Sequence, residues 1–536
     1  MKASDLFVKC LETEGVRYIF GIPGEENLDL LESLRKSEIK LILTRNEQTA
    51  VFMAANYGRF TGKPGIAIST LGPGATNLVT GVGYAQLNGL PVILITGQKP
   101  IKKSKQGEFQ IIDIVSMMKP LTKSARQIQS ASRIPAHIRQ AFKTAISERP
   151  GAVHLELPED IAREEVDEVP IIQEDIRRPV VEDKAFSKLV DALEKSKTPI
   201  VLIGAGANRK RISKYLTEFV KQYNIPFFES QMGKGVVDER LPQYVGTAAL
   251  SSGDDVHKVI DQADLILAVG HDTLEKPTNF IHSQDNKTKL IHINYYESKT
   301  DEVYHPDMEI IGDIGNLFWR LCKAKINAKW NHDLMYETAL KSKEKIKGYN
   351  LKKINSKLTT PQLLINTLRN SLDENDIVAL DNGWYKIWFA RNYHVYHPNT
   401  LLLDNTFATM GAGLASGTIA KYLNPESKTV VITGDGGLIM NLGDLETTVR
   451  LGINIVVIVV NNSSYGMIKI KQKQQGLTEF GLDLINPDFV KLAESFGAKG
   501  VRLEDASALD ETIKQALKTK GAVIIDVPFE YPENFE

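Results

Sequence analysis

A carboxylate and an amide side chain stand where two predicted β-strands end, in the C-terminal third of the chain. Asp435 follows the apolar run Val430–Thr433, and Asn462 follows the run from Ile453 to Val460. Between these runs, the residues from Leu438 to Leu451 have helical spacing. This order predicts two parallel strands joined by one crossover helix, and ligands bind at the carboxyl ends of such strands. Asp435 and Asn462 are therefore expected to lie in a binding site.

Two glycines directly after Asp435 add a second kind of group to this site. Gly436 and Gly437 have no side chains where the helix is expected to begin, so their backbone N–H groups can hold an anion such as a phosphate. Carboxylate and amide oxygens beside a phosphate suit Mg²⁺, which prefers oxygen ligands and usually bridges to phosphates. The pattern favours a metal–diphosphate site, although an ordinary strand–helix turn with a glycine pair has the same spacing.

The composition limits the class of protein. The chain has 536 residues, which is enough for about three domains of ordinary size. With 42% hydrophobic residues, 24% charged residues and a formal net charge of −1, neither nucleic acid nor an anionic membrane is expected as the main partner. The two cysteines, Cys10 and Cys322, predict neither a disulfide framework nor a zinc site. No signal peptide or membrane-spanning run is predicted, which favours a cytoplasmic protein.

Three α/β blocks are predicted, each a doubly wound parallel sheet. Near-continuous apolar runs separated by helical stretches are what a parallel sheet covered on both faces requires. The blocks are expected at residues 1–165, 184–330 and 358–536. In the third block, Thr360 is expected to cap a helix that begins at Pro361. Besides the two runs named above, strands are predicted at Tyr18–Phe20, Leu41–Leu43, Gly65–Ile68, Val92–Ile95, Ile200–Ile203, Leu265–Val269, Lys289–Ile293 and Ile377–Leu380.

The stretch from Gly434 to Asn462, GDG followed some two dozen residues later by NN, resembles the diphosphate motif of thiamine-diphosphate enzymes. The resemblance runs along nearly the whole chain and is closest to the acetolactate synthase branch, especially its catabolic type. It includes GWYKIWFAR at Gly383–Arg391 and NPDFVKLAESFGAKG at Asn486–Gly500. It implies the thiamine-diphosphate-binding fold, with a pyrimidine domain, a central domain and a diphosphate domain. Thiamine diphosphate and Mg²⁺ are the implied cofactors.

In the third block, the resemblance implies residues for both the metal and the cofactor. Asp435 and Asn462 would give side-chain oxygens to Mg²⁺, and Ser464 would give its backbone carbonyl. Met410 corresponds to the apolar wedge that bends the cofactor, although a Met among apolar neighbours is more often plain core. The cofactor-binding residues implied here are Gly383, Trp384, Tyr385, Thr409, Met410, Gly434, Asp435, Gly436, Gly437, Asn462, Ser464, Tyr465, Gly466, Met467 and Ile468.

In the first block, the resemblance points to Glu47 as a catalytic residue. A lone glutamate at a helix start is usually a favourable partner of the helix dipole. In thiamine-diphosphate enzymes, however, the glutamate at this place hydrogen-bonds the aminopyrimidine ring and promotes loss of the thiazolium C2 proton. Asn46 stands where related synthases commonly have His. Two strand-end turns add further implied residues: Pro23, Gly24, Thr70, Gly72 and Asn77, with Gly24 facing the reaction centre.

Phe109 and Gln110 resemble the Phe-Gln pair that lines the pocket above the thiazolium in acetolactate synthases. Simple 2-oxoacid decarboxylases carry paired histidines there as proton donors. Without a nearby acid to protonate the carbanion, ligation is favoured over release of an aldehyde, so Phe109 and Gln110 are predicted to be catalytic. The alternative interpretation is a buried aromatic side chain beside a surface amide.

The second block raises the question of FAD. The turn Gly204–Asn208 contains a GxG pair, but Arg209 stands at the third glycine of a dinucleotide fingerprint, and a lone GxG is weak evidence. Anabolic synthases hold FAD against this domain, whereas catabolic synthases do without it. The stretches His271–Pro277 and Tyr304–Asp307 look more like the catabolic type, so FAD is not expected.

The resemblance therefore predicts an acetolactate synthase, which condenses two pyruvates to 2-acetolactate and CO2 through hydroxyethyl-thiamine diphosphate. Three alternatives stay open: another thiamine-diphosphate-dependent 2-oxoacid decarboxylase or carboligase, an FAD-containing anabolic catalytic subunit, and a non-catalytic homologue, which the presence of Glu47, Asp435 and Asn462 makes the weakest. In the family, the first and third blocks that meet at one cofactor come from different chains. A homodimer or homotetramer is accordingly expected.

Overall fold

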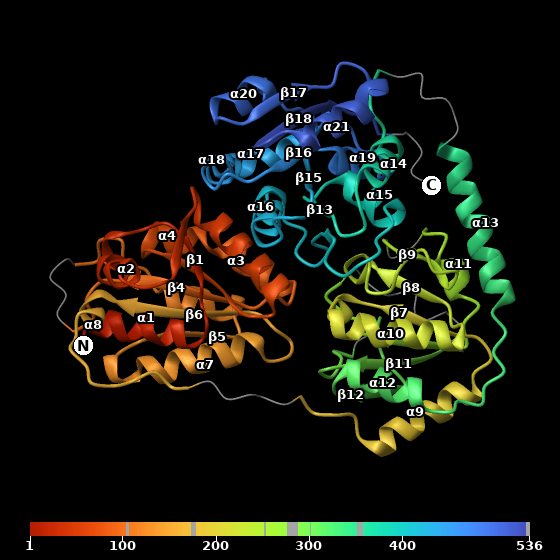
Figure 1. The fold of residues 1–536 in the computed structure, drawn as a ribbon, viewed down its shortest axis with the longest axis horizontal. Coiled ribbons are helices and arrows are strands. Elements are labelled where there is room, and N and C mark those ends of the chain that lie inside the picture. The colour runs from red at the N-terminus through yellow and green to blue at the C-terminus, as the bar shows by residue number, and fades with distance from the viewer. Residues whose placement is uncertain are drawn as a thin grey trace.

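The computed structural model describes residues 1–102, 107–172, 178–250, 253–275, 288–300, 302–350 and 357–531. It contains three parallel sheets of six strands each, with helices packed on their faces, and this confirms the predicted fold class (Figure 1). The N-terminal, central and C-terminal domains form three lobes, and helix α13 (Asp333–Asn350) runs along the outer side of the central domain. Within the described residues, none of the helices combines the length and the apolar character needed to cross a membrane.

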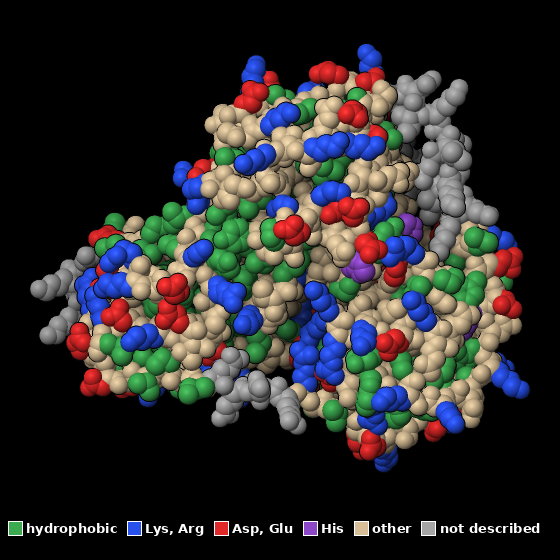
Figure 2. Space-filling view, viewed as in Figure 1, with side chains coloured by type: hydrophobic (Ala, Val, Ile, Leu, Met, Phe, Trp, Pro, Cys, Tyr) green, Lys and Arg blue, Asp and Glu red, His purple; other side chains and the backbone are tan. Residues whose placement is uncertain are grey.

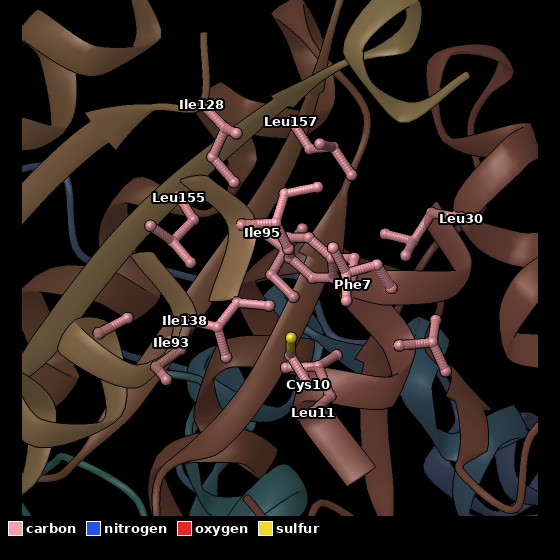
Figure 3. Packing of buried hydrophobic residues seen from close by; sticks show 14 of the residues in the cluster. Phe7, Cys10, Leu11, Leu30, Ile93, Ile95, Ile128, Ile138, Leu155 and Leu157 are labelled. Carbon is pink, nitrogen blue, oxygen red and sulfur yellow. The ribbon is translucent and has the colours of Figure 1, made fainter. Parts of the chain in front are cut away.

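The N-terminal sheet has the strand order β2-β1-β3-β4-β6-β5. One face is covered by α1, whose Phe7, Cys10 and Leu11 pack against apolar side chains of β4 and β6 such as Ile95 and Leu155 (Figure 3). The strands are β1 (Tyr18–Gly21), β2 (Lys40–Leu43), β3 (Gly65–Ser69), β4 (Val92–Gln98), β5 (Ser124–Gln127) and β6 (Ala152–Pro158). The helices are α1 (Ala3–Thr13), α2 (Leu28–Arg35), α3 (Glu47–Thr61), α4 (Gly72–Asn77), α5 (Val79–Leu87), α6 (Ile114–Met118), α7 (Ile134–Ile146) and α8 (Glu159–Ala162).

The central sheet has the strand order β12-β11-β10-β7-β8-β9. Its strands are β7 (Pro199–Ile203), β8 (Phe227–Ser230), β9 (Tyr244–Ala248), β10 (Leu265–Val269), β11 (Lys289–Asn294) and β12 (Met308–Ile311). Its helices are α9 (Asp183–Lys195), α10 (Lys210–Tyr223), α11 (His257–Ile260) and α12 (Ile314–Lys323), and a short 3-10 turn, η5 (Gln231–Gly233), follows β8.

The C-terminal sheet has the strand order β14-β13-β15-β16-β18-β17. Its strands are β13 (Ile377–Leu380), β14 (Leu401–Leu402), β15 (Thr429–Gly434), β16 (Ile455–Asn461), β17 (Lys499–Arg502) and β18 (Ala522–Pro528). Its helices are α14 (Pro361–Ser371), α15 (Trp384–Asn392), α16 (Gly413–Leu423), α17 (Asp435–Met440), α18 (Leu445–Arg450), α19 (Gly466–Gln474), α20 (Phe489–Ser495) and α21 (Leu509–Lys518).

The predicted strands all occur, and the predicted cap at Thr360 is confirmed, since its side chain accepts from the Leu363 backbone N–H. The continuous helix predicted between Leu438 and Leu451 is wrong. Helix α17 ends at Met440, and α18 begins at Leu445. Asn441, at the break, donates from Nδ2 to the Gly411 carbonyl at 3.0 Å, so the interruption ties this segment to the loop before α16.

The N-terminal and C-terminal domains of one chain pack through α3 and α16. Buried Asn56 of α3 donates from Nδ2 to Ser416 Oγ of α16 at 3.0 Å. Nearby, the Arg45 backbone N–H donates to Asp444 Oδ1 at 2.8 Å. The α3 helix that begins at Glu47 is therefore anchored to the C-terminal domain of its own chain.

Candidate functional site

A cavity of about 370 Å³ lies in the C-terminal domain at the carboxyl ends of β13, β15 and β16. In the sheet, β14 lies on one side of β13, and β15 followed by β16 lies on the other side. The connections that leave β13 and β14 therefore run in opposite directions across the sheet. Such a topological switch point is where ligands bind in open α/β sheets. Gly383 after β13, Asp435 after β15 and Asn462 after β16 all line this cavity.

The structure brings together nearly all the residues implied for cofactor binding in this domain. Thr409 does not line the cavity, but its backbone carbonyl accepts from Asn382 Nδ2 at 2.7 Å, beside Met410. The implied residues that do line it are Gly383, Trp384, Tyr385, Met410, Gly434, Asp435, Gly436, Gly437, Asn462, Ser464, Tyr465, Gly466, Met467 and Ile468.

The buried carboxylate of Asp435 organises the loop that holds the other two implied metal ligands. Its Oδ2 accepts from the Ser463 backbone N–H at 2.7 Å and from Asn486 Nδ2 at 2.8 Å. Ser463 adopts a left-handed φ of 52°, a conformation that is uncommon for residues other than glycine. These contacts set the loop between Asn462 and Ser464 beside Asp435.

The donor set suits Mg²⁺. No cluster of three or more His, Cys, Asp or Glu side chains that could hold a metal occurs in the described part of the chain. A divalent ion here would instead take one carboxylate (Asp435), one amide oxygen (Asn462) and one backbone carbonyl (Ser464), which is the oxygen-only chemistry that Mg²⁺ prefers. The remaining positions of a magnesium ion are normally filled by water and phosphate oxygens.

The glycine pair after Asp435 is required by close packing. A Cβ on Gly437 would lie 2.5 Å from Asp381 Oδ2, and a Cβ on Gly436 would lie 3.0 Å from Cε1 of Tyr465. Side chains at these positions would fill the wall of the cavity where a diphosphate needs backbone N–H groups. The geometry fits the anion site expected from the sequence.

Asp381 is a fully buried carboxyl group beneath this wall. It accepts hydrogen bonds from the Gly411 backbone N–H at 2.9 Å and from Thr433 Oγ1 at 3.0 Å. Burial raises the pKa of Asp381 to about 6, against the opposing effect of the hydrogen bonds that it accepts. The residue joins the ends of β13 and β15 to the turn after Met410, so it positions the cavity wall.

Several lining residues were not predicted. Tyr531 follows the last strand, and its ring packs 3.4 Å from the position of a Cβ on Gly466. Gln231 reaches the cavity from the central domain, in the turn after β8. The others are Asn382, Lys386, Ile387, Asn405, Ala408 and Val460. Of these, only Asn382, Lys386 and Ile387 could have been predicted from the sequence, because they flank or belong to the GWYKIWFAR stretch.

Glu47 belongs to a second group of residues, at the switch point of the N-terminal sheet. It is buried in the first turn of α3, next to Asn46, whose side chain caps the helix. Its Oε2 accepts from Asn77 Nδ2 at 3.0 Å, and a Cβ on Gly74 would lie 3.2 Å from its Oε1. The Glu47 carboxylate is thus fixed against the turn that follows β3.

The two turns implied beside Glu47 are in contact with each other. A Cβ on Gly24 would lie 2.2 Å from the Cβ of Thr70, so no other residue fits there without movement. Thr70 donates to the carboxylate of Glu26, which is also paired with buried Lys99 at 2.6 Å. Pro23, just before Gly24, is exposed.

Gln110 lies against the same group of residues, directly after Phe109 in the chain. Gly72, at a left-handed φ of 49°, approaches so closely that a Cβ would lie 2.8 Å from the Gln110 carbonyl oxygen. The side chain of Phe109 is 66% exposed in the single chain, so the alternative of a buried aromatic side chain is wrong. The exposed side chain of Phe109 is available to line a site that another protein surface completes.

Within one chain, these two groups of residues remain separate. The described residues that line the 370 Å³ cavity come from the central and C-terminal domains, and Glu47 is not among them. The single chain therefore presents two half-sites: an N-terminal half-site around Glu47 and a C-terminal half-site around Asp435.

In the GxG turn of the central domain, a backbone N–H group already donates a hydrogen bond to a side chain of the same domain. Oε1 of buried Glu275 accepts from the Ala205 backbone N–H at 2.9 Å. Burial raises the pKa of Glu275 to about 7, despite the hydrogen bonds that it accepts from Ala205 and Ser230. The N–H group that a nucleotide phosphate would use is thus taken by a side chain. Lys276 and Pro277, which belong to the catabolic-like stretch, lie outside the described residues.

Three family models match the chain in order. Residues 1–117 match the N-terminal TPP binding domain of thiamine pyrophosphate enzymes, residues 186–321 match their central domain, and residues 381–527 match their C-terminal TPP binding domain. Both half-sites fall within the two TPP binding domains.

Similar proteins match over nearly their full length. An acetolactate synthase of Bacillus subtilis is 32% identical, over 99% of this chain and 94% of its own. A probable acetolactate synthase large subunit of Methanocaldococcus jannaschii is also 32% identical, over 98% of this chain and 92% of its own. A catabolic acetolactate synthase of Raoultella terrigena is 29% identical, over 99% and 95% of the two chains. These matches agree with the resemblance found in the motifs.

Proposed function

Because the chain belongs to the thiamine pyrophosphate enzyme family, we propose that it is an acetolactate synthase, which joins two pyruvates to form 2-acetolactate and CO2. Thiamine diphosphate, when bound, supplies the carbanion that attacks the second 2-oxoacid. Asp435, Asn462 and the Ser464 carbonyl are proposed to hold Mg²⁺, and Glu47 to hold a proton for the aminopyrimidine ring.

One observation carries the choice of ligation over aldehyde release. In the described part of the cavity lining there is no His, and Asp435 is the only carboxylate. At the other half-site, Gln110 packs on the Gly72 turn and follows Phe109 in the chain, and neither side chain can donate a proton as an imidazolium can. Because the described cavity lining contains no imidazolium, attack of the carbanion on a second carbonyl is favoured over its protonation.

Product analysis tests this function. With pyruvate, thiamine diphosphate, Mg²⁺ and no added flavin, the enzyme is expected to release CO2 and 2-acetolactate in equal amounts and almost no acetaldehyde. The same mixture with added 2-oxobutyrate shows whether a second acceptor is used. Acetaldehyde as the main product would instead indicate a decarboxylase, and no turnover of pyruvate would indicate another substrate or a non-catalytic protein.

FAD is not part of the proposal. Glu275 already occupies the Ala205 N–H at the switch point of the central sheet, and a Cβ on Gly206 would lie only 2.9 Å from the Gly270 carbonyl oxygen. A phosphate would have to displace this carboxylate before it could bind the turn. The catabolic type of synthase therefore agrees better with this domain than the FAD-containing anabolic type.

The two half-sites support an obligate homodimer, with each active site built from two chains. A cofactor that touches both Glu47 and Asp435 needs the half-sites to face each other, but in one chain Glu47 is not among the described residues that line the cavity around Asp435. Hydrophobic side chains gather on the face where the N-terminal and C-terminal lobes meet (Figure 2). Large apolar side chains near the two half-sites are exposed, among them Phe109, Met440 and Phe480. A two-fold dimer would bury such surface and make two sites at once, and two dimers can pair further into a tetramer.

Mixing two inactive variants tests this arrangement. Glu47→Gln and Asp435→Ala chains, dissociated and reassociated in equal amounts, are expected to recover up to about a quarter of wild-type activity, because half of the dimers are mixed and one of their two sites is intact. Each variant taken alone through the same treatment is the control. If mass spectrometry finds mixed dimers but no activity returns, each site is built within one chain.

A further inference from the structure

Gln231 is a residue of the central domain that lines the cavity of the C-terminal half-site. It opens the turn η5 directly after β8, and its side chain is 1% exposed. Of the described residues that line this cavity, it is the only one that the central domain provides. A buried amide needs partners for both its donor and its acceptor, so its contacts decide what else it can bind.

Only the donor half of this amide has a protein partner. Nε2 of Gln231 donates to the Ala249 backbone carbonyl at 2.6 Å. Oε1 is buried and accepts no hydrogen bond from any described residue. Turning the amide over would place Oε1 against the Ala249 carbonyl, where two acceptors repel each other, so this bond fixes the orientation of the amide. Oε1 is therefore the polar atom that the side chain can offer to a ligand in the cavity, and a donor from that ligand would satisfy it.

The turn that carries Gln231 is held in place at several points. Oγ of Ser230, the N-cap of η5, accepts from the Gly233 backbone N–H at 3.2 Å and donates to the buried carboxylate of Glu275. A Cβ on Gly233 would lie 2.1 Å from the Ile203 carbonyl oxygen, so the turn lies directly against β7. These contacts keep the acceptor of Gln231 in a defined position.

Contacts between domains hold this amide beside the helices α15 and α19. The backbone N–H of Ala249 donates to Asp254 Oδ2 at 2.8 Å, and Arg391 of α15 donates from Nε to Asp254 Oδ1 at 2.6 Å. Ala249 also belongs to one apolar cluster with Trp384 of α15 and Met467 of α19. The first turns of both helices line the cavity. The residue that binds the Gln231 amide thus lies where the central domain meets these two turns.

The two helix N-termini indicate which part of the ligand lies at this side of the cavity. Their backbone N–H groups carry partial positive charge, which suits an anion such as a diphosphate. An acceptor oxygen beside anionic oxygens is repelled unless a hydrogen atom lies between them. A bound magnesium diphosphate offers two kinds of O–H group, the waters that Mg²⁺ retains and the hydroxyl of a singly protonated terminal phosphate.

We propose that Gln231 is a cofactor-contacting residue, and that its Oε1 accepts a hydrogen bond from an O–H group of the magnesium diphosphate. The inference rests on the proposed function, because it takes thiamine diphosphate to be the ligand of the C-terminal half-site. Metal-bound water and a protonated phosphate share the chemistry that Gln231 recognises, and the experiment separates them. The central domain then contributes directly to the cofactor site.

The test compares wild type with Gln231→Met, which keeps the length of the side chain and removes its acceptor. The Kd for thiamine diphosphate with Mg²⁺ is measured by quenching of tryptophan fluorescence, since Trp384 lines the cavity. Competition against it gives the Kd for inorganic pyrophosphate with Mg²⁺ and for thiamine. For both diphosphates a roughly 3- to 10-fold rise in Kd is expected, the effect of losing one hydrogen bond. The Kd for thiamine, which has no diphosphate, is expected to stay the same.

The pH dependence of this effect separates the two kinds of O–H group. A phosphate hydroxyl ionises with a pKa of about 6, so as a donor it would be lost between roughly pH 5 and pH 8. The ratio of the variant Kd to the wild-type Kd would then fall toward one as the pH rises. A water bound to Mg²⁺ keeps its hydrogen atoms over this range, and the ratio would stay constant.

Gln243 offers a matched control. It is a buried glutamine of the central domain whose Nε2 donates to Asn224 Oδ1 at 2.7 Å. Its Oε1 likewise accepts no hydrogen bond within the described part of the chain, but Gln243 lies outside the cavity. Gln243→Met is expected to bind all three probes as wild type does. If Gln231→Met is not folded, Gln231→Asn, which keeps the amide and withdraws it by one methylene, replaces it with the same expected direction.

Each other outcome overturns the inference. An unchanged Kd for thiamine diphosphate and pyrophosphate in the Gln231 variant would mean that Oε1 does not contact the diphosphate. An equal rise in the Kd for thiamine would mean a purely structural role. A wild-type protein that binds no thiamine diphosphate would overturn the proposed function as well, and this result is distinct because it appears before any variant is made.

Discussion

Asp435→Ala is expected to leave a folded chain that does not retain thiamine diphosphate and has no measurable synthase activity. Asp435 is the only carboxylate among the described residues that line the C-terminal half-site, so without it a divalent ion would have only neutral oxygen ligands there. Loss of an outer-shell partner alone costs a metal site about 10–100-fold in affinity, and loss of the single charged ligand is expected to cost more than roughly 100-fold. Cofactor that stays bound after desalting, together with initial rates, measures the effect.

The control for this variant is another aspartate of the same domain with similar bonds. Asp488 accepts from two backbone N–H groups, of Val490 at 3.0 Å and Lys491 at 3.1 Å, at the start of α20. Asp488→Ala is expected to lower stability slightly, as for a lost helix cap, with no change in cofactor retention. Full wild-type activity after exhaustive chelation and dialysis would contradict a metal-dependent site altogether.

Most of the strands predicted from the sequence coincide with nearly continuous apolar runs. Val430–Thr433 and Leu265–Val269 are buried on both faces and have no polar interruption. Strand β6 was not predicted because His154 and Glu156 break its apolar pattern. In the structure these side chains are buried and paired, His154 Nε2 with Thr96 Oγ1 at 2.9 Å and Glu156 with Gln127 at 2.7 Å.

Two edge strands, β5 and β17, were missed for a different reason. Strands β5 and β17, with the sequences SARQ and KGVR, lie at the edges of their sheets and are only partly buried. Their position depends on pairing with β6 and β18, which are distant in sequence, and not on a local apolar period. Local patterns cannot predict such strands.

The residues of the candidate site also fall into those that a local sequence pattern predicts and those that depend on contacts between distant segments. Asp435, Gly437 and Asn462 follow predicted strands directly, so their meeting at one sheet edge could be predicted from the order of the elements. Gln231 and Tyr531 reach the cavity from the turn after β8 and from the segment after β18, through packing between domains and along the chain terminus. Nothing in the neighbouring sequence indicates such contacts.

Glu47 shows what the structure adds to a single-residue prediction. The sequence placed a glutamate at the start of a helix, where a favourable interaction with the helix dipole is explanation enough. In the structure, the helix is already capped by Asn46, whose Oδ1 accepts from the Gln48 N–H at 2.8 Å. Glu47 is buried instead beside Asn77 and the glycine turn. A carboxylate held away from solvent and not needed as a cap is well placed for acid–base work.

Glu47→Gln is therefore expected to slow exchange of the cofactor's C2 proton by roughly 10²–10⁴-fold, the usual contribution of a positioned acid–base group, and to lower synthase activity with it. The affinity for thiamine diphosphate is expected to change little, because an amide keeps the shape of the side chain and can still accept from Asn77. Hydrogen–deuterium exchange at C2, followed by NMR after acid quench, measures the rate.

Glu156→Gln is the matched control, since Glu156 is a buried carboxyl of the same domain that likewise accepts from side-chain amides, of Gln98 and Gln127. If Glu47→Gln exchanges the C2 proton at the wild-type rate, Glu47 serves only the packing of α3 against the turn after β3.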